Sequence, residues 1–294
     1  MHKNLLNISD LTNKDVNQIL LSASELNLKN TNVLHGKSIG LIFEKYSTRT
    51  RLSFQVGIRQ LNGYPIDIRF EELNLQRVES FEDTFKILSL YIDAIIFRTT
   101  SHSKLISASK VFKKPIINGL SDLSHPCQII SDCYTLKEHF KSLDGLSISW
   151  LGDMNNVLFS YFELFKLFPE MKLNVFTNKS IYQNNFDKFP KSENINFYFE
   201  IDKDVIIDSD CIMTDVFTSM NDENNDKELL LKNFQVNSSL MKITKDDCVF
   251  MHCLPANKGI EVTEEVLISS KSLVMKQAKN RLIAQKGILK WLNI

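Results

Sequence analysis

The feature that most constrains this chain is a repeated alternation of short apolar runs with helix-length segments. Runs of this kind, flanked by turn-forming or polar residues, are typical of buried strands in a parallel sheet, and the intervening segments are then crossover helices. The sequence therefore predicts an α/β fold. The apolar runs are residues 39–43, 93–97, 115–117, 146–151, 172–176, 211–214 and 248–251.

The alternation occurs in two sets, separated near residues 141–145, and the length of 294 residues suits two domains. We expect two lobes, each a mostly parallel sheet flanked by helices. The predicted boundaries are 1–144 for the first lobe and 145–275 for the second. A final helix, residues 276–294, is expected to pack back on the first lobe.

The composition excludes several classes of protein. The 35 basic and 35 acidic residues cancel, which argues against a general nucleic-acid or membrane-surface binder. The sequence has neither an apolar run of membrane-spanning length nor a signal-peptide pattern, so we expect a cytoplasmic protein. The five cysteines are scattered and form no CxxC pair, which predicts reduced thiols and no metal site.

Residues 43–51 read Phe-Glu-Lys-Tyr-Ser-Thr-Arg-Thr-Arg at the junction of a strand and a helix. Ser47 is a candidate N-cap, and a helix start offers free N–H groups to an anion. Hydroxyls and guanidiniums at that point predict a phosphate site. The alternative is a capped surface helix with solvated arginines. Arg98, directly after a strand, is either a phosphate ligand or half of a strand-end ion pair.

Other polar residues also follow apolar runs, in both sets, which favours a site in a cleft between the lobes. His125 is a hydrogen-bond donor or acid–base group, or else a capping histidine, and Asp215 binds an amine or caps a helix. Cys253 precedes Leu-Pro, where a cis turn can hold carbonyls toward a ligand. Adjacent strand residues point to opposite faces, so we favour a binding role for Cys253 over a nucleophile activated by His252. The turn at residues 152–156 lacks G-x-G-x-x-G, which argues against NAD.

Together these motifs resemble the aspartate/ornithine carbamoyltransferase family over nearly the whole chain. The resemblance implies transfer of a carbamoyl group from carbamoyl phosphate to the side-chain amine of ornithine, through a tetrahedral intermediate, in arginine biosynthesis. It also implies that the protein needs no cofactor or metal and forms a homotrimer or an assembly of trimers. The matching stretches are residues 43–51, 118–122, 125–128, 152–156, 215–220, 252–256 and 280–281.

The resemblance also implies roles for individual residues. Those implied to bind carbamoyl phosphate are Ser47, Thr48, Arg49, Thr50, Asn74, Arg98, His125, Pro126, Cys127, Gln128, Cys253, Leu254 and Arg281. Those implied to bind ornithine are Asn156, Asp215, Ser219 and Met220. The implied catalytic residues are Arg49, Arg98, His125, Asp215, Cys253 and Arg281.

The chain departs from the family pattern in two loops. Asn74 stands where the family has a glutamine that reaches a neighbouring subunit's site, and both glycines of that loop are replaced. Phe217 replaces a tryptophan and Asn221 a glycine. Two alternative functions are a carbamoyltransferase for another amine, such as putrescine, and a non-catalytic paralogue that binds an anion.

Overall fold

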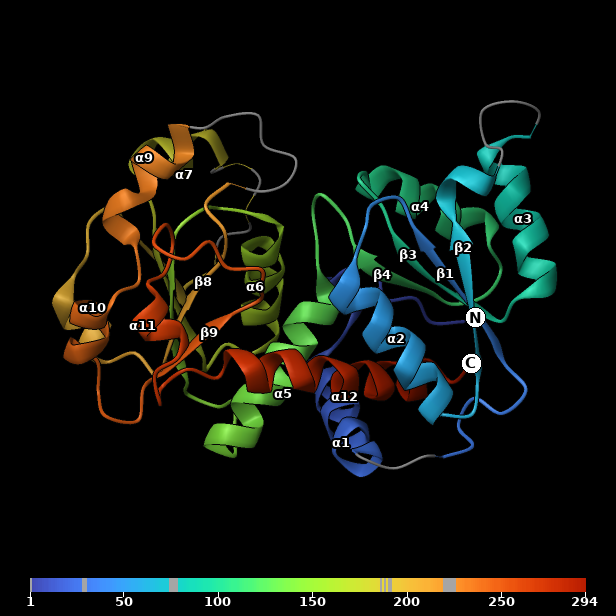
Figure 1. Ribbon diagram of the computed structural model, residues 1–294, viewed down its shortest axis with the longest axis horizontal. Coiled ribbons are helices and arrows are strands. Elements are labelled where there is room, and N and C mark those ends of the chain that lie inside the picture. Colours follow the sequence, from blue (N-terminus) through green and yellow to red (C-terminus); the bar gives the residue numbers. More distant parts are fainter. Residues whose placement is uncertain are drawn as a thin grey trace. The chain divides into compact units, whose positions relative to one another are not determined.

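The computed structural model describes residues 2–27, 31–73, 79–185, 187, 189, 192–218 and 226–294. The chain divides into two compact units: unit 1, Met1–Tyr134 with Lys279–Ile294, and unit 2, Thr135–Ala278. Each unit contains a parallel sheet flanked by helices, so the predicted α/β fold class is correct (Figure 1). None of the described helices is long and apolar enough to cross a membrane.

The sheet of unit 1 has the strand order β2-β1-β3-β4, and all its pairings are parallel. Its central strands are buried because they consist of apolar residues on both faces; Ile42 and Phe97 are fully enclosed and pack with Phe85 of α3. The bounds of the strands are β1 Ser38–Phe43, β2 Tyr64–Arg69, β3 Ala94–Arg98 and β4 Ile116–Leu120.

Two helices of unit 1 begin at the caps that their sequences indicate: Thr12 accepts from Asp15 N–H, and Ser80 accepts from Asp83 N–H. The helices are η1 Ile8–Asp10, α1 Asn13–Leu26, α2 Thr48–Gln60, η2 Phe70–Leu73, α3 Phe81–Tyr91, α4 His102–Val111 and α5 Pro126–Phe140, with α12 Val274–Leu292 ending in this unit.

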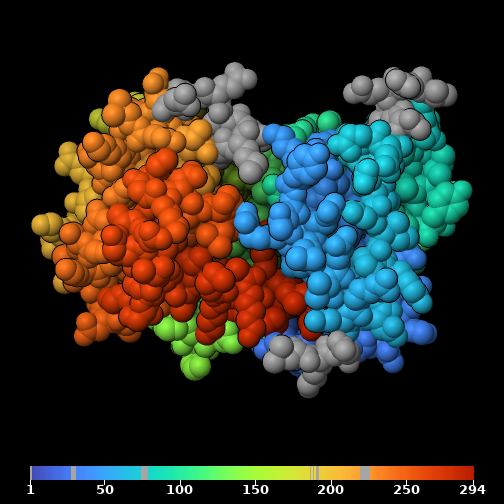
Figure 2. Space-filling view, viewed as in Figure 1, coloured from blue at the N-terminus to red at the C-terminus, as the bar shows by residue number. Residues whose placement is uncertain are grey.

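The C-terminal helix lies beside α2 within unit 1 (Figure 2). A Cβ on Gly57 of α2 would lie 3.3 Å from Leu282 Cδ1, and Lys286 Nζ donates to Gln60 Oε1 at 3.0 Å. Glycine thus lets the two helices approach closely, which brings Arg281 to the start of α2.

The sheet of unit 2 has the order β7-β6-β5-β8-β9 and is also parallel. Its strands are β5 Ser147–Leu151, β6 Lys172–Phe176, β7 Ile195–Tyr198, β8 Cys211–Thr214 and β9 Val249–His252. The helices are α6 Asn156–Leu167, α7 Lys179–Asn185, α8 Lys203–Ile207, α9 Asp226–Leu231, η4 Lys232–Phe234, α10 Ser238–Ile243 and α11 Glu264–Leu267.

Each sheet contains one place where the winding direction reverses. From β1 the chain proceeds to β2 on one side and later returns to β3 on the other; from β5 it proceeds to β6 and later returns to β8. Right-handed crossovers then place the connecting helices on opposite faces, which opens a crevice at the carboxyl ends of the two strands. The fold therefore predicts ligand sites beyond β1 and β3 in unit 1, and beyond β5 and β8 in unit 2.

Candidate active site

The crevice of unit 1 begins with Ser47, the N-cap residue of α2. Its hydroxyl makes no side-chain cap bond to the helix; Arg98 at the end of β3 donates to it instead, with 3.1 Å between Nη1 and Oγ. Ser47 is therefore an N-cap by position, as predicted, but its side chain leaves the first N–H groups of α2 to another acceptor. Thr48 and Arg49 follow it on the exposed surface of the first turn.

The charges in this crevice are mainly positive. Burial lowers the pKa of the Arg98 guanidinium to about 10, and the like charges of Arg281 and Arg49 act in the same direction. Three guanidiniums that repel one another form a site that a multiply charged anion would stabilise.

Arg281 joins α12 to the rest of the crevice. Its Nη2 lies 2.7 Å from Thr50 Oγ1 and 2.9 Å from His125 Nε2, and all three residues are buried. A guanidinium only donates, so His125 Nε2 is the acceptor and the neutral ring carries its hydrogen on Nδ1. Burial, then the cations Arg281 and Arg98, hold the pKa of His125 well below its usual range, so the ring is neutral at pH 7.

The residues after His125 open α5. Pro126 takes the first helical position, where its missing N–H costs nothing. Burial raises the pKa of Cys127 to about 12, so it remains a thiol, and it donates to Asn118 O. Gln128 Nε2 donates to Asp132 Oδ1 at 2.8 Å, while its buried Oε1 has no hydrogen-bond partner in the described part of the chain.

Glu44 is a residue of this crevice that the sequence did not single out as functional. Its carboxylate accepts from Thr99 Oγ1 at 2.8 Å, from Thr100 N–H at 2.7 Å and from Lys104 Nζ at 2.9 Å. It thus ties the end of β1 to the segment that follows Arg98. The strand-end position of Glu44 was a visible signal, but its partners lie more than 50 residues away.

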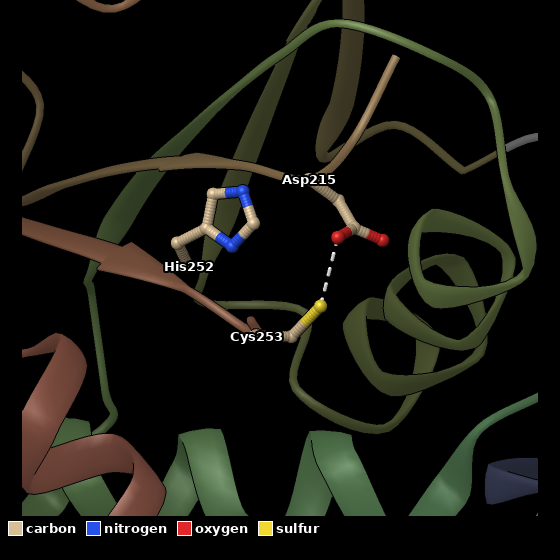
Figure 3. Close-up of side chains that lie close together, drawn as sticks. All are labelled: Asp215, His252 and Cys253. Carbon is tan, nitrogen blue, oxygen red and sulfur yellow. Dashed lines mark hydrogen bonds between the residues drawn. The ribbon is translucent and has the colours of Figure 1, made fainter. Parts of the chain in front are cut away.

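In unit 2, Asp215 follows β8 and is nearly buried. Cys253 Sγ points toward it and donates to Oδ1 at 2.9 Å (Figure 3). Asn155 Nδ2 donates to Oδ2 at 2.8 Å, and Asn156 is the half-buried first residue of α6. The structure therefore brings together Asp215 and Cys253 from the predicted set, and adds Asn155, which belongs to the matching stretch 152–156 but had been given no role.

His252 lies close to Cys253, with donor atoms within 4.8 Å of each other, although adjacent strand residues were expected to point to opposite faces. Its Nε2 lies 3.2 Å from Glu261 Oε1, and its Nδ1 accepts from Leu254 N–H at 2.9 Å. The Leu254–Pro255 peptide bond is cis, and Leu254 has a positive φ of 56°. The His252–Glu261 pair therefore holds the turn that presents Cys253 and Leu254.

Asp215, His252 and Cys253 have donor atoms within 4.8 Å of one another, a spacing that a metal ion can occupy. Both ring nitrogens of His252 are, however, engaged by Leu254 N–H and Glu261. Ligation through His252 would break one of these bonds, so the geometry favours a positioning role for the histidine.

Three predicted site residues lie outside the described part of the chain: Asn74, Ser219 and Met220. Beyond residues 219–225, Nζ of Lys227 donates to the buried carboxylate of Asp153 at 3.0 Å.

The two parts of the chain match two family descriptions. Residues 3–138 match the family description "Aspartate/ornithine carbamoyltransferase, carbamoyl-P binding domain", and residues 144–292 match "Aspartate/ornithine carbamoyltransferase, Asp/Orn binding domain".

Individual relatives match along nearly their whole length. An ornithine carbamoyltransferase of Bradyrhizobium diazoefficiens is 39% identical over 297 residues, which cover 98% of this chain and 96% of the relative. One from Methanococcus aeolicus is 40% identical over 302 residues, with 98% of each chain covered. The crystal structure of the Thermus thermophilus ornithine carbamoyltransferase superimposes with a TM-score of 0.89 at 32% identity and full coverage of both chains. The chain belongs to the aspartate/ornithine carbamoyltransferase family.

Proposed function

We propose that this protein is an ornithine carbamoyltransferase, which converts carbamoyl phosphate and L-ornithine to L-citrulline and phosphate. The observation that carries the donor half of the proposal is the group of Arg49, Arg98 and Arg281 beside the start of α2. A phosphate dianion there would offset the burial of the Arg98 guanidinium and the repulsion from Arg281 and Arg49, which together lower the pKa of Arg98.

The donor would be held by both of its ends. Ser47, Thr48 and the N–H groups of the first turn of α2 suit the phosphate oxygens. Thr50 and Arg281 supply donors for the carbamoyl oxygen, next to His125. The buried, unpartnered Oε1 of Gln128 suits the N–H groups of the carbamoyl amide. Pro126 and Cys127 fix the start of the helix that carries this glutamine.

The acceptor would be held in unit 2. We assign Asp215 to the side-chain amine of ornithine, and Asn156, Ser219 and Met220 to its amino-acid end. The carbonyls of Cys253 and Leu254 are assigned to the carbamoyl group. These assignments follow the family resemblance. The hydrogen bond from Cys253 Sγ to Asp215 Oδ1 supports the assignment of Asp215.

The chemistry requires the amine of the acceptor to reach the carbonyl carbon of the bound donor. The neutral amine attacks, a C–N bond forms, and the carbonyl electrons move to oxygen as a tetrahedral oxyanion. When the oxyanion collapses, the C–O bond to phosphate breaks, and the attacking nitrogen loses one proton, which phosphate can accept. Cationic donors such as Arg281 would stabilise the oxyanion, so positioning and electrostatics supply the catalysis.

The test is citrulline formation by the purified protein, with Arg49→Ala as the control. We expect product with ornithine and carbamoyl phosphate, and kcat/KM for ornithine about tenfold or more above that for putrescine, which corresponds to the net contribution of about one hydrogen bond. Comparable values for the two amines would favour the alternative acceptor. Phosphate binding without any product from the unsubstituted protein would favour the non-catalytic paralogue.

Two further parts of the proposal come from the family resemblance alone: a homotrimer or an assembly of trimers, and a place in arginine biosynthesis. A cytoplasmic location stays a prediction from the sequence pattern. The domain boundaries at 144/145 and 275/276 also stay predictions. Light scattering on the purified protein tests the trimer directly, because a monomer would have the chain mass of 33.9 kDa.

A further inference from the structure

Asn155 uses both ends of its side-chain amide. Oδ1 accepts from Val157 N–H at 3.0 Å and from Leu158 N–H at 3.1 Å, which caps α6. Turning the amide over would replace this acceptor by a donor and lose both bonds. The helix cap therefore fixes Nδ2 as the group that faces Asp215, 2.8 Å from Oδ2.

The carboxylate of Asp215 is thereby held from two separate elements. Oδ2 accepts from Asn155 at the start of α6, and Oδ1 accepts from Cys253 just beyond β9. A carboxylate has about four lone-pair positions, so these two bonds fix its plane and leave further positions for a ligand amine. Because Asp215 is nearly buried, its orientation depends on these neighbours more than on water.

Capping alone does not account for asparagine at this position. Aspartate caps a helix equally well but would set a second negative oxygen against Asp215. Serine also caps well but is too short to satisfy the helix and reach Asp215 at once. Asparagine combines an acceptor for the helix with a donor for the carboxylate.

We propose that Asn155 is a positioning residue for the acceptor amine: it couples the start of α6 to the orientation of the Asp215 carboxylate. The inference rests on the proposed carbamoyltransferase function, since it gives the aligned carboxylate an amine to bind. It concerns a residue that does not itself touch the substrate.

The first test compares Asn155→Ser and Asn155→Asp, both of which keep a capping side chain. The matched controls are Asn237→Ser and Asn237→Asp. Asn237 caps α10 with the same pair of bonds, to Ser239 N–H and Leu240 N–H at 3.1 Å, and makes no side-chain bond to a carboxylate within the described ranges.

We expect both Asn155 variants to lower kcat/KM for ornithine by about tenfold or more, the effect of losing a hydrogen bond to a charged group. KM for carbamoyl phosphate should change by less than about threefold, since the donor residues are untouched. The Asn237 variants should match the unsubstituted protein within about twofold. Equal effects on both substrates, or equal effects at Asn237, would assign Asn155 a capping role only and overturn the proposal.

The second test needs no turnover. The Cys253 thiol donates to Asp215, and it is half-exposed, whereas the other four cysteines are buried. Alkylation requires the thiolate, which a fixed carboxylate neighbour disfavours. Asn155→Ser frees Asp215 to turn away, so iodoacetamide should alkylate Cys253 about threefold faster or more, measured by peptide mass spectrometry.

The two readouts separate the possible failures. Faster alkylation in Asn155→Ser, together with an unsubstituted protein that makes no citrulline, would support the positioning of Asp215 while the proposed function fails. Citrulline formation with unchanged kinetics and unchanged or slower alkylation in Asn155→Ser would overturn the positioning while the proposed function stands.

Discussion

Replacing Glu44 by glutamine tests what holds the crevice of unit 1 together. Oε2 of Glu44 accepts three hydrogen bonds, from Thr99 Oγ1 and from the N–H and Oγ1 of Thr100, at 2.8, 2.7 and 2.9 Å. Oε1 accepts from Lys104 Nζ at 2.9 Å. Glutamine keeps the shape and one acceptor oxygen, but it removes the charge and turns an NH2 group toward either Lys104 or the threonines.

The expected loss follows from these contacts. A hydrogen bond to a charged group contributes roughly 1.5–3 kcal/mol, whereas an ion pair with a half-exposed lysine such as Lys104 contributes about 0–1 kcal/mol. Glutamine retains part of the bonding to Thr99 and Thr100, so we expect Glu44→Gln to lower the free energy of unfolding by about 2–3 kcal/mol. For a chain of this size that is roughly 4–12 °C in Tm.

The stability that Glu44→Gln loses should depend on pH. Burial alone would raise the pKa of Glu44, but hydrogen bonds from Lys104, Thr100 and Thr99 outweigh it and hold the pKa below its ordinary value of 4.5. A carboxyl whose pKa is lowered on folding contributes stability that is complete above its unfolded pKa and is lost as the pH falls through its folded pKa. The difference in the free energy of unfolding between the two proteins should therefore be complete at pH 7 and should become smaller below pH 4.5.

The assay is urea denaturation of both proteins between pH 3 and pH 8, with Lys104→Met as the matched control. Lys104→Met removes the exposed ion pair and leaves the bonds to Thr99 and Thr100, so it should cost no more than about 1 kcal/mol. A Glu44→Gln protein within about 0.5 kcal/mol of the unsubstituted one at pH 7 would refute the reasoning, because surface substitutions have effects of that size. A difference in the free energy of unfolding that does not change with pH would refute it as well.

Three other substitutions or labelling experiments test separate parts of the structure. Gly152→Ala should lower the free energy of unfolding by about 1–3 kcal/mol in urea, because Gly152 has a φ of 131° and a Cβ would lie 2.8 Å from Phe217 Cε1; an unchanged midpoint would contradict this packing. Cys127, whose pKa burial raises to about 12, should stay unlabelled by a thiol-disulfide reagent at pH 8 in the native protein, and peptide mapping that finds it labelled would contradict its burial. Arg281→Met keeps the length but removes the donors to Thr50 and His125, so kcat/KM for carbamoyl phosphate should fall by about tenfold or more in the citrulline assay; a value within twofold would remove Arg281 from the proposed mechanism.

Elements with strong local patterns were predictable from the sequence. The strands Lys172–Phe176 and Cys211–Thr214 have the predicted bounds, because apolar runs end there at turn-forming or polar residues. The helix α4, His102–Val111, was missed because it buries only His102, Leu105 and Ala108. The edge strand β7 was missed because only Ile195 of its residues is buried. Both elements depend on neighbours distant in the sequence.

The same limit applies to the site. The strand-end positions of Arg98 and Asp215 followed from periodicity, but their partners did not. Arg98 bonds Ser47 across 51 residues, and Asp215 bonds Asn155 across 60 residues. The Ser47 hydroxyl was expected to cap α2, yet it accepts from Arg98, because a guanidinium competes for the same oxygen. Local patterns identify which residues reach a crevice, and tertiary structure decides which of them bond.

The two switch points carry opposite charges, and this separation suits the proposed donor and acceptor. The crevice beyond β1 and β3 carries the cations Arg49 and Arg98, whereas the crevice beyond β5 and β8 carries the carboxylate of Asp215. A carboxylate placed among the arginines of one crevice would pair with them and weaken the site for phosphate. The guanidiniums would then occupy the lone pairs of that carboxylate, so that an amine could not bind to them. Glu44, the carboxylate of the first crevice, is already engaged by Thr99, Thr100 and Lys104, so the arginines there stay available to an anion, while Asp215 on the other sheet stays available to an amine.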